Sequence, residues 1–104
     1  MKRIYTYGHD QVERNITISD IIENKKNRVK MTQVTAQNSE EAEILSDQNI
    51  DMIITGSDTY DDVRKGAPNT FITAALFAGR FITKDEILKG AIDVAMKGAD
   101  SVLT

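Results

Sequence analysis

The hydrophobic pattern of this chain alternates between segments with the spacing of a β-strand and segments with the spacing of an α-helix. Four short stretches are apolar or alternate as strands do: VKMTQVTA (29–36), IDMIIT (50–55), NTFITAAL (69–76) and SVLT (101–104). The apolar run in IDMIIT is typical of a strand buried on both faces. The segments between the strands have helical spacing, with apolar positions recurring every three or four residues. Such alternation with short loops predicts a parallel sheet with right-handed crossovers.

Each predicted helix begins with a capping pattern, in which an acid follows a side-chain oxygen by three residues. Such a pair satisfies backbone N–H groups that the first helical turn leaves open. The pairs are Thr17 with Asp20, Asn38 with Glu41, Thr59 with Asp62, and Thr83 with Glu86. The first pair opens a short lead-in helix before the first parallel strand. Within the predicted elements, Met31, Met52 and Met96 are interpreted as core residues.

Residues 1–16 precede this helix and hold two short alternating stretches on either side of Gly8-His9-Asp10. They predict a β-hairpin or an extended arm. His9, the only histidine, is interpreted as a solvated loop residue. Residues 17–104 then form one domain of strand-helix units.

Two of the strands begin alike, which indicates a weak internal repeat. NIDMIIT (49–55) and GADSVLT (98–104) share a helix stop, a small or apolar residue, an aspartate and a four-residue strand that ends in Thr. Repeats of this kind suit a (β/α)8 barrel, which needs about 250 residues, so this chain would hold four of its eight strands. The alternative is an open, flavodoxin-like sheet. A barrel sector has its strands in chain order, whereas a flavodoxin-like sheet places the first strand between the second and the third.

Composition narrows the class of protein. The chain has 104 residues, a net charge of −3 and no cysteine. The mild acidity does not favour a nucleic-acid or anionic-membrane partner, and no apolar run approaches the about 20 residues of a membrane span. The lack of cysteine excludes disulfides and thiolate metal sites. We therefore predict a cytoplasmic protein with no nucleic-acid and no membrane partner.

Three segments carry a resemblance to a known family. VRKGAPNTFITAAL (63–76) and the later FITKDEILKGAIDVAMKGADSV (81–102) resemble the ketopantoate hydroxymethyltransferase (3-methyl-2-oxobutanoate hydroxymethyltransferase) family. In that family a Val-Arg-Arg-Gly-Ala-Pro-Asn motif precedes the third strand, and a helix ending in Gly-Ala-Asn or Gly-Ala-Asp precedes the fourth. TISDIIENKKNRVKMTQVTAQN (17–38) is similar to the family's lead-in helix and first strand. The likeness covers residues 17–104, with a gap after Thr59, where the family carries a longer loop.

The resemblance implies a fold and an activity. The fold is the first half of a TIM-type (β/α)8 barrel of the phosphoenolpyruvate mutase and isocitrate lyase group. The activity is that of a transferase of pantothenate biosynthesis, which passes a hydroxymethyl group from methylenetetrahydrofolate to an α-keto acid with the help of Mg²⁺. The resemblance also implies a cytoplasmic oligomer. The residues themselves do not indicate these cofactors.

The resemblance also points to site residues at the carboxyl ends of the strands, where such barrels have their active sites. After its second strand the family has Gly-Asp-Ser, whose Asp holds the metal and whose neighbour touches the keto acid. This chain has Gly56-Ser57-Asp58. Ser57 and Asp58 are therefore the candidate substrate-binding residues, and Asp58 is the candidate metal ligand. The alternative is that Asp58 is a solvated loop residue or a helix cap.

Other positions depart from the family. Ala75 stands where the family has its second metal carboxylate, and Leu103 stands where it has a lysine. No catalytic residue of the family is matched, so the sequence supports the family more strongly than its activity. Arg64 and Lys65 suggest a phosphate site or, more simply, charges that complement the dipole at the end of a helix.

Three functional hypotheses follow. The first is a ketopantoate hydroxymethyltransferase-like protein that is incomplete or inactive as this chain. The second is a non-catalytic or repurposed relative of the same barrel, and the third is a flavodoxin-like domain that binds a small ligand. Four strands in sector order would leave two unpaired edges. The expected partners are therefore a second copy or the missing C-terminal half of the barrel, with a small keto acid as ligand.

Overall fold

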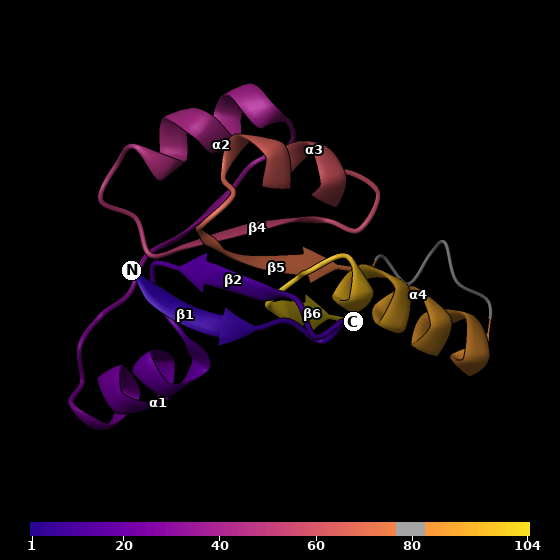
Figure 1. The fold of residues 1–104 in the computed structure, drawn as a ribbon, viewed down its shortest axis with the longest axis horizontal. Coiled ribbons are helices and arrows are strands. Elements are labelled where there is room, and N and C mark those ends of the chain that lie inside the picture. Colours follow the sequence, from indigo (N-terminus) through magenta and orange to yellow (C-terminus); the bar gives the residue numbers. More distant parts are fainter. Residues whose placement is uncertain (77–82) are drawn as a thin grey trace.

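The computed structural model describes residues 1–76 and 83–104, and its described strands form two sheets. Residues near the amino terminus form an antiparallel hairpin from β1 (Lys2–Tyr5) and β2 (Gln11–Arg14). The parallel strands are β3 (Gln33–Thr35), β4 (Met52–Gly56), β5 (Phe71–Ala75) and β6 (Ser101–Leu103). The helices are α1 (Ile18–Lys26), α2 (Ser39–Ser46), α3 (Tyr60–Gly66) and α4 (Lys84–Met96) (Figure 1).

The parallel sheet has the order β3-β4-β5-β6, which is the order of the chain. This confirms the predicted α/β class and the predicted consecutive order of the strands. The flavodoxin-like alternative is wrong, because β3 lies at the edge of the described sheet, beside β4 alone. The first two residues of the predicted FITKDEIL stretch, 81 and 82, lie outside the described residues.

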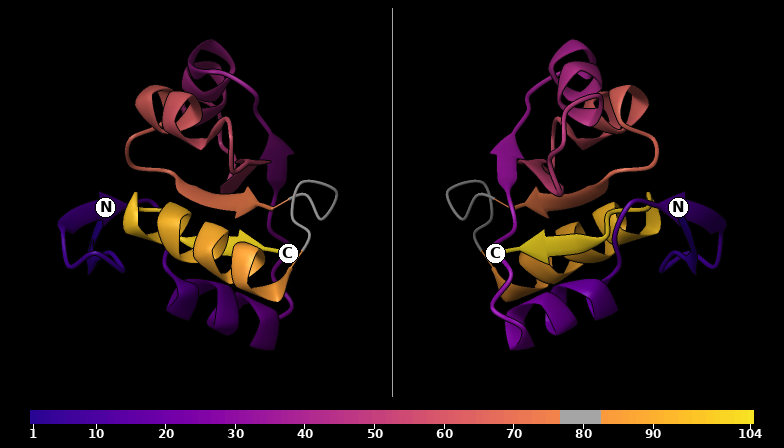
Figure 2. Two further views of the ribbon diagram at one scale, coloured as in Figure 1. Left: turned by 90° about the vertical axis from the view of Figure 1, so that its right-hand side faces the viewer. Right: turned by 90° about the vertical axis from the view of Figure 1, so that its left-hand side faces the viewer.

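The helices cover the sheet unequally. Helices α2 and α3 pack against each other on one side of the sheet (Figure 1), and α4 lies along β6 (Figure 2). The core is built from small and β-branched residues with one tyrosine: Ala36, Ala42, Ile53, Tyr60, Val63, Ala67, Ile72, Ala74 and Val94. These side chains belong to α2, α3, α4 and the sheet face beneath them. Helix α1 contributes no buried residue.

Helices α2 and α3 approach so closely that their contact requires a glycine. A Cβ atom on Gly66 would lie 2.0 Å from the carbonyl oxygen of Ser39 and 3.0 Å from the Cβ of Ala42. Both distances are shorter than van der Waals contact, so a larger residue would push the two helices apart. The glycine of the Arg64-to-Asn69 motif therefore has a packing role.

Three of the four predicted helix caps are confirmed. Thr17 forms a full capping box with Asp20, and the side chains of Asn38 and Thr83 accept the N–H groups of Glu41 and Glu86. The prediction for Thr59 is wrong. Its backbone is helical (φ −104°, ψ −1°), whereas a capping residue needs extended backbone to turn its oxygen toward the first turn.

The side chain of Asp20 also accepts a hydrogen bond from Lys2 of the hairpin. This bond, followed by the bond from the backbone N–H of Thr17, holds the pKa of Asp20 below its ordinary value of 3.8. The carboxylate therefore joins the start of α1 to the start of β1. Both partners are at least partly exposed to solvent.

The two aspartates of the internal repeat occupy equivalent positions. Asp51, just before β4, accepts the N–H of Thr32 beside the start of β3 at 2.8 Å. Asp100, just before β6, accepts the N–H of Ile72 in β5 at 3.0 Å. Each carboxylate thus ties its own strand to the beginning of the preceding strand in the sheet, which gives the sequence repeat a physical reason.

The prediction that Met96 is a core residue is wrong. Its side chain is 53% exposed and shares one flank of α4 with Leu88 and Ile92, which are also exposed. These three residues are spaced by four and form a stripe beside the inward one, which contains the buried Val94. Met52 is half-buried. In the part of the chain that the structure describes, every helix falls short of the length and hydrophobicity needed to cross a membrane.

Candidate functional site

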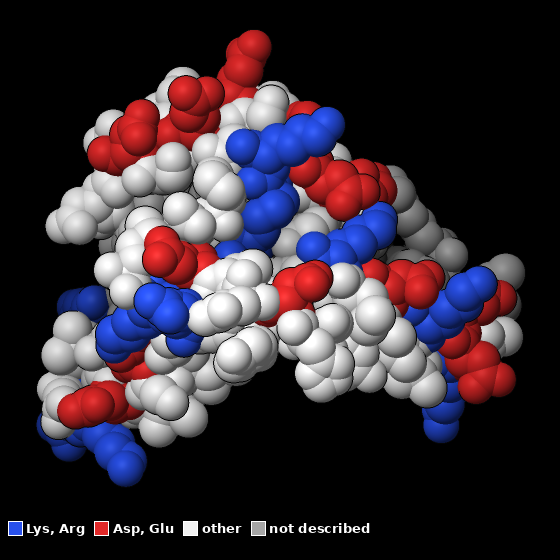
Figure 3. Space-filling view, viewed as in Figure 1, with Lys and Arg blue, Asp and Glu red and all other residues white. Residues whose placement is uncertain are grey.

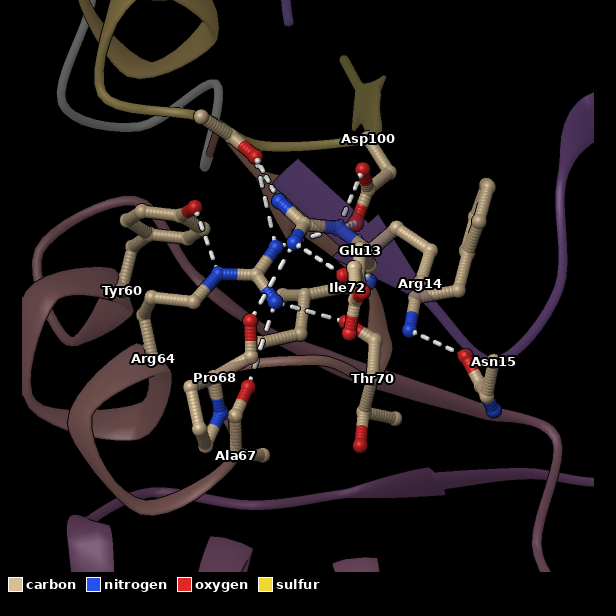
Figure 4. A network of polar contacts seen from close by, with 12 residues as sticks. Glu13, Arg14, Asn15, Tyr60, Arg64, Ala67, Pro68, Thr70, Ile72 and Asp100 are labelled. Carbon is tan, nitrogen blue, oxygen red and sulfur yellow. Dashed lines mark hydrogen bonds and ion pairs between the residues drawn. The ribbon is translucent and has the colours of Figure 1, made fainter. Parts of the chain in front are cut away.

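Two clusters of polar side chains lie at opposite ends of the parallel strands. The first, at the amino ends, centres on Asp100, whose side chain is 4% exposed (Figure 4). Arg14 of β2 donates from Nε to Asp100 Oδ1 at 2.8 Å, and Arg64 of α3 donates from Nη2 to Asp100 Oδ2 at 2.9 Å. One buried carboxylate therefore faces two guanidinium groups that come from the hairpin and from the central helices.

Every nitrogen of both guanidinium groups donates to an oxygen of the protein. Arg14 also donates to the carbonyl oxygens of Glu13, Pro68 and Gly98. Arg64 donates to the Tyr60 hydroxyl at 2.9 Å, and its remaining bonds reach the carbonyl oxygens of Ala67, Thr70 and Gly98. The Arg64 guanidinium also lies 5.4 Å from the centroid of the Tyr60 ring, within the range of a cation–π contact.

This saturation decides the role of Arg64. A phosphate site needs N–H donors that point at the ligand, whereas every nitrogen of Arg64 and Arg14 already donates to a protein oxygen. The phosphate interpretation of Arg64 is therefore not supported. The dipole role is, because Arg64 and Lys65 lie in the last turn of α3 and Arg64 donates to the carbonyl oxygen of Ala67 at the end of that helix. The residue also locks α3 to β6, while Arg14 locks the hairpin to the same carboxylate.

Asn15, the residue after β2, extends this attachment of the hairpin. Its side-chain amide donates to the carbonyl of Asp51 at 2.9 Å, and its side-chain oxygen accepts the N–H of Phe71 at 2.9 Å. The hairpin thus contacts residues at the starts of three neighbouring parallel strands, namely Asp51, Phe71 and Asp100. Protein groups therefore fill the amino ends of these strands.

The second cluster lies at the carboxyl ends of the strands and surrounds an open cavity of about 520 Å³. Its size falls in the range of small-molecule sites. Its polar lining consists of Thr35, Gln37, Thr55, Asp58 and Thr59. Its apolar lining includes Ile54, Ala75 and Leu103. Ligands of parallel α/β proteins bind at this end of the sheet, which makes this cavity, the strand-end pocket, the candidate functional site.

The hydroxyl groups in the strand-end pocket are held in place by one another. Thr59 Oγ1 lies 2.5 Å from Thr55 Oγ1 and donates to the carbonyl oxygen of Gly56 at 3.2 Å. Thr55 is buried on β4, and Thr59 directly precedes α3. The pair therefore fixes the loop that carries Ser57 and Asp58 against the end of the strand.

The structure separates the two predicted site residues. Asp58 lines the strand-end pocket and is exposed. Ser57 does not line it, and its backbone N–H donates to the carbonyl oxygen of Ala75 at 2.9 Å. Ser57 thus continues the ladder between β4 and β5, whereas Asp58 is the acid that reaches the cavity.

The donor set of the strand-end pocket does not fit the Mg²⁺ site that the resemblance implies. Ala75 and Leu103 line the cavity at the ends of β5 and β6, where the resemblance implies a second carboxylate and a lysine. Mg²⁺ takes hard oxygen ligands, usually with one or two carboxylates. The described residues contain no group of three histidine, cysteine or acidic side chains placed to hold a metal.

Sequence reasoning found Asp58 but missed most of both clusters. One signal in the sequence was available for three of the missed residues, namely their position at or shortly after the end of a strand. Thr35 is the last residue of β3, Gln37 follows β3, and Thr59 follows β4. The Arg14–Asp100 pair had none, because 86 residues separate its members. These two charged side chains meet only in the folded structure.

Comparisons of this chain with protein-family models, with curated proteins and with solved structures find no significant match.

Proposed function

We propose that this chain is a ketopantoate hydroxymethyltransferase-like (β/α) protein that binds a small α-keto acid in the strand-end pocket and does not turn it over by itself. The fold in this proposal is one half of a TIM-type barrel. The proposal rests on the sequence resemblance together with the position of the pocket.

One observation carries the proposal. The four parallel strands run in chain order, and the cavity at their carboxyl ends is lined by the loop after β4. That loop holds Asp58, to which the resemblance assigns substrate and metal contact. A barrel sector with this order and a pocket at this end is what the family implies.

A second observation favours the non-catalytic alternative over an active enzyme. Ala75 contributes a methyl group to the wall of the pocket where the family implies a metal carboxylate. A bound keto acid would then be held by hydroxyl and amide groups, without two carboxylates to position a Mg²⁺ ion. The proposal therefore separates binding, which we expect, from hydroxymethyl transfer, which we do not.

The test is a titration of the ¹⁵N-labelled chain with 3-methyl-2-oxobutanoate, followed by the amide signals of Thr35, Gly56 and Asp58. We expect these signals to shift with a Kd of the order of 1 mM. The Asp58→Asn variant should alter the titration. The matched control Asp61→Asn, which changes an exposed acid of α3 outside the pocket, should leave it unchanged.

Two further arms separate the hypotheses. Calorimetry with MgCl₂ should give no Kd well below about 1 mM, and incubation of the keto acid with methylenetetrahydrofolate should yield no hydroxymethylated product. Product formation would overturn the proposed lack of turnover. Absence of any shift at about 10 mM keto acid, or equal shifts with the matching 2-hydroxy acid, would overturn the proposed ligand class.

A further inference from the structure

The parallel sheet has two edges without a partner strand in the part of the chain that the structure describes. Strand β3 pairs with β4 alone, and β6 pairs with β5 alone. All three residues of β3 are exposed. Parallel sheets are almost always covered on both faces, and an open edge is a template for another strand.

The backbone of β3 is already divided between its two sides. The N–H of Met52 donates to the carbonyl of Thr32, and the N–H of Ala36 donates to the carbonyl of Ile54. Residues 32, 34 and 36 therefore face β4. Because alternate residues of a parallel strand bond to opposite sides, Gln33 and Thr35 turn their N–H and C=O groups to the open edge.

The helices beside the two open edges carry apolar side chains on their outer flanks. In α2, Ala42 is buried against α3, whereas Ile44, on the opposite side of the helix, is 63% exposed. In α4, Leu88, Ile92 and Met96 form the exposed stripe described above. Each flank has the composition of a helix surface that packs against a neighbouring strand-helix unit.

A cavity of about 510 Å³ opens beside the start of β6, between the hairpin, the start of α1 and the end of α4. Tyr5, Ala95 and Val102 are among its walls. Figure 3 shows a mostly uncharged hollow along the rim between α1 and α4. The edge of β6 thus lies in an apolar groove.

We propose that the edge of β6 receives β3 of a second copy of this chain, and that two copies related by a two-fold axis close a barrel of eight parallel strands. The two edges of one chain are complementary, because β6 beside a second β3 continues the chain-order pattern of β3-β4-β5-β6. A two-fold pair uses each edge once in each copy and leaves none open. Eight parallel strands are also the number at which such a sheet closes around a filled interior.

The exposed apolar surface is of the size that such a pair requires. A stable interface buries about 800 Å² on each partner. Six large apolar residues flank the open edges, each at least 36% exposed: Val34, Ile44, Leu88, Ile92, Met96 and Leu103. Pairing would remove up to about 60–120 Å² of apolar surface of each residue from water. The backbone of the two strand edges would add to the buried area. Pairing would also close the strand-end pocket, because Thr35 and Leu103 of the two edge strands line it.

The test compares two substitutions at one exposed position. Gln33→Pro removes an N–H that faces the open edge and spares the bonds to β4, and proline is tolerated on edge strands. The matched control Gln33→Thr keeps that N–H. In sedimentation equilibrium we expect twice the 11.6 kDa of one chain for the parent and for Gln33→Thr. We expect a folded single chain for Gln33→Pro.

Hydrogen exchange on the unmodified chain gives an independent readout should Gln33→Pro fail to fold. The amides of Gln33 and Thr35 should be protected as strongly as that of Val34, which faces β4. A single-chain mass for the parent at about 100 μM, a mass above two copies, a dimeric Gln33→Pro, or unprotected amides at Gln33 and Thr35 would each overturn the pairing. Pairing requires no keto acid, so its failure leaves the ligand titration to be judged separately.

Discussion

At the amino ends of the parallel strands, Arg14 and Asp100 are charged side chains that are 3% and 4% exposed, and protein atoms meet each of their polar groups. At the carboxyl ends, the polar residues are hydroxyl, amide and carboxyl groups around an open cavity. Buried charges are costly when they lose a partner, so the first end is committed to holding the fold. The second end can change its contacts at less cost, and this is where a ligand can be accommodated.

The strongest way to break this contrast is to remove the shared carboxylate. Asp100→Ala leaves the buried guanidinium group of Arg14 and the half-buried one of Arg64 without their counter-ion, and we expect a loss of about 3–5 kcal/mol in the free energy of unfolding. Urea denaturation measures it. The control is Asp61→Ala, which breaks the exposed ion pair between Asp61 and Lys97 and should cost at most about 1 kcal/mol. Similar losses for both variants would show that burial does not distinguish the two pairs.

A change at the other end sharpens the comparison. Thr55 is as buried as Arg14, yet Thr55→Val should lower the free energy of unfolding by less than about 1 kcal/mol. Thr59 keeps its hydrogen bond to the carbonyl of Gly56, and valine fits a strand well. The same urea titration checks this value. A loss comparable to that of Asp100→Ala would mean that the carboxyl end is also required for the fold.

The smallest expected effect concerns the partly exposed ion pair between Lys2 of the hairpin and Asp20 of α1. The pKa of Asp20 is lowered in the folded state by Lys2 and Thr17, so its carboxylate stabilises the fold above the ordinary pKa of 3.8. That contribution is lost as the pH falls through 3.8 and the folded pKa, because the unfolded chain takes up the proton first. Unfolding at about pH 6 and about pH 2.5 should therefore differ less for Asp20→Asn than for the parent. Glu23→Gln in the same helix is the control and should keep the parent's pH dependence.

The sequence predicted what depends on neighbours along the chain. The alternation of strands and helices and the caps at Thr17 and Thr83 follow from local spacing and were confirmed. Local spacing left the order of the strands in the sheet open, and the consecutive order that was confirmed had been expected from the family resemblance. Thr59 had the same spacing, but its backbone is helical and its hydroxyl contacts Thr55 on the preceding strand instead of capping α3. A tertiary contact there overrides a local pattern.

Burial and charge pairing were harder to predict. Met96 lies one helical flank away from the inward stripe of α4, and hydrophobicity alone does not tell an inward stripe from an exposed one. In the strand-end pocket, the resemblance drew attention to Asp58 and Ser57, but only the structure distinguishes the residue that lines the cavity from the one whose backbone continues the ladder. The Arg14–Asp100–Arg64 cluster joins three distant segments, which no local pattern connects.

The paired aspartates before β4 and β6 fix where each strand starts relative to its neighbour. A slip of one residue would move the carboxylate of Asp51 or Asp100 away from the backbone N–H that it accepts near the start of the neighbouring strand, and would turn every side chain of that strand to the other face. These two contacts therefore help to align β4 with β3 and β6 with β5 at one end of the sheet, through residues that take no part in the strand-end pocket. Substitutions at the carboxyl ends leave this alignment intact, so the lining of the pocket is free to diversify while the scaffold beneath it keeps its geometry.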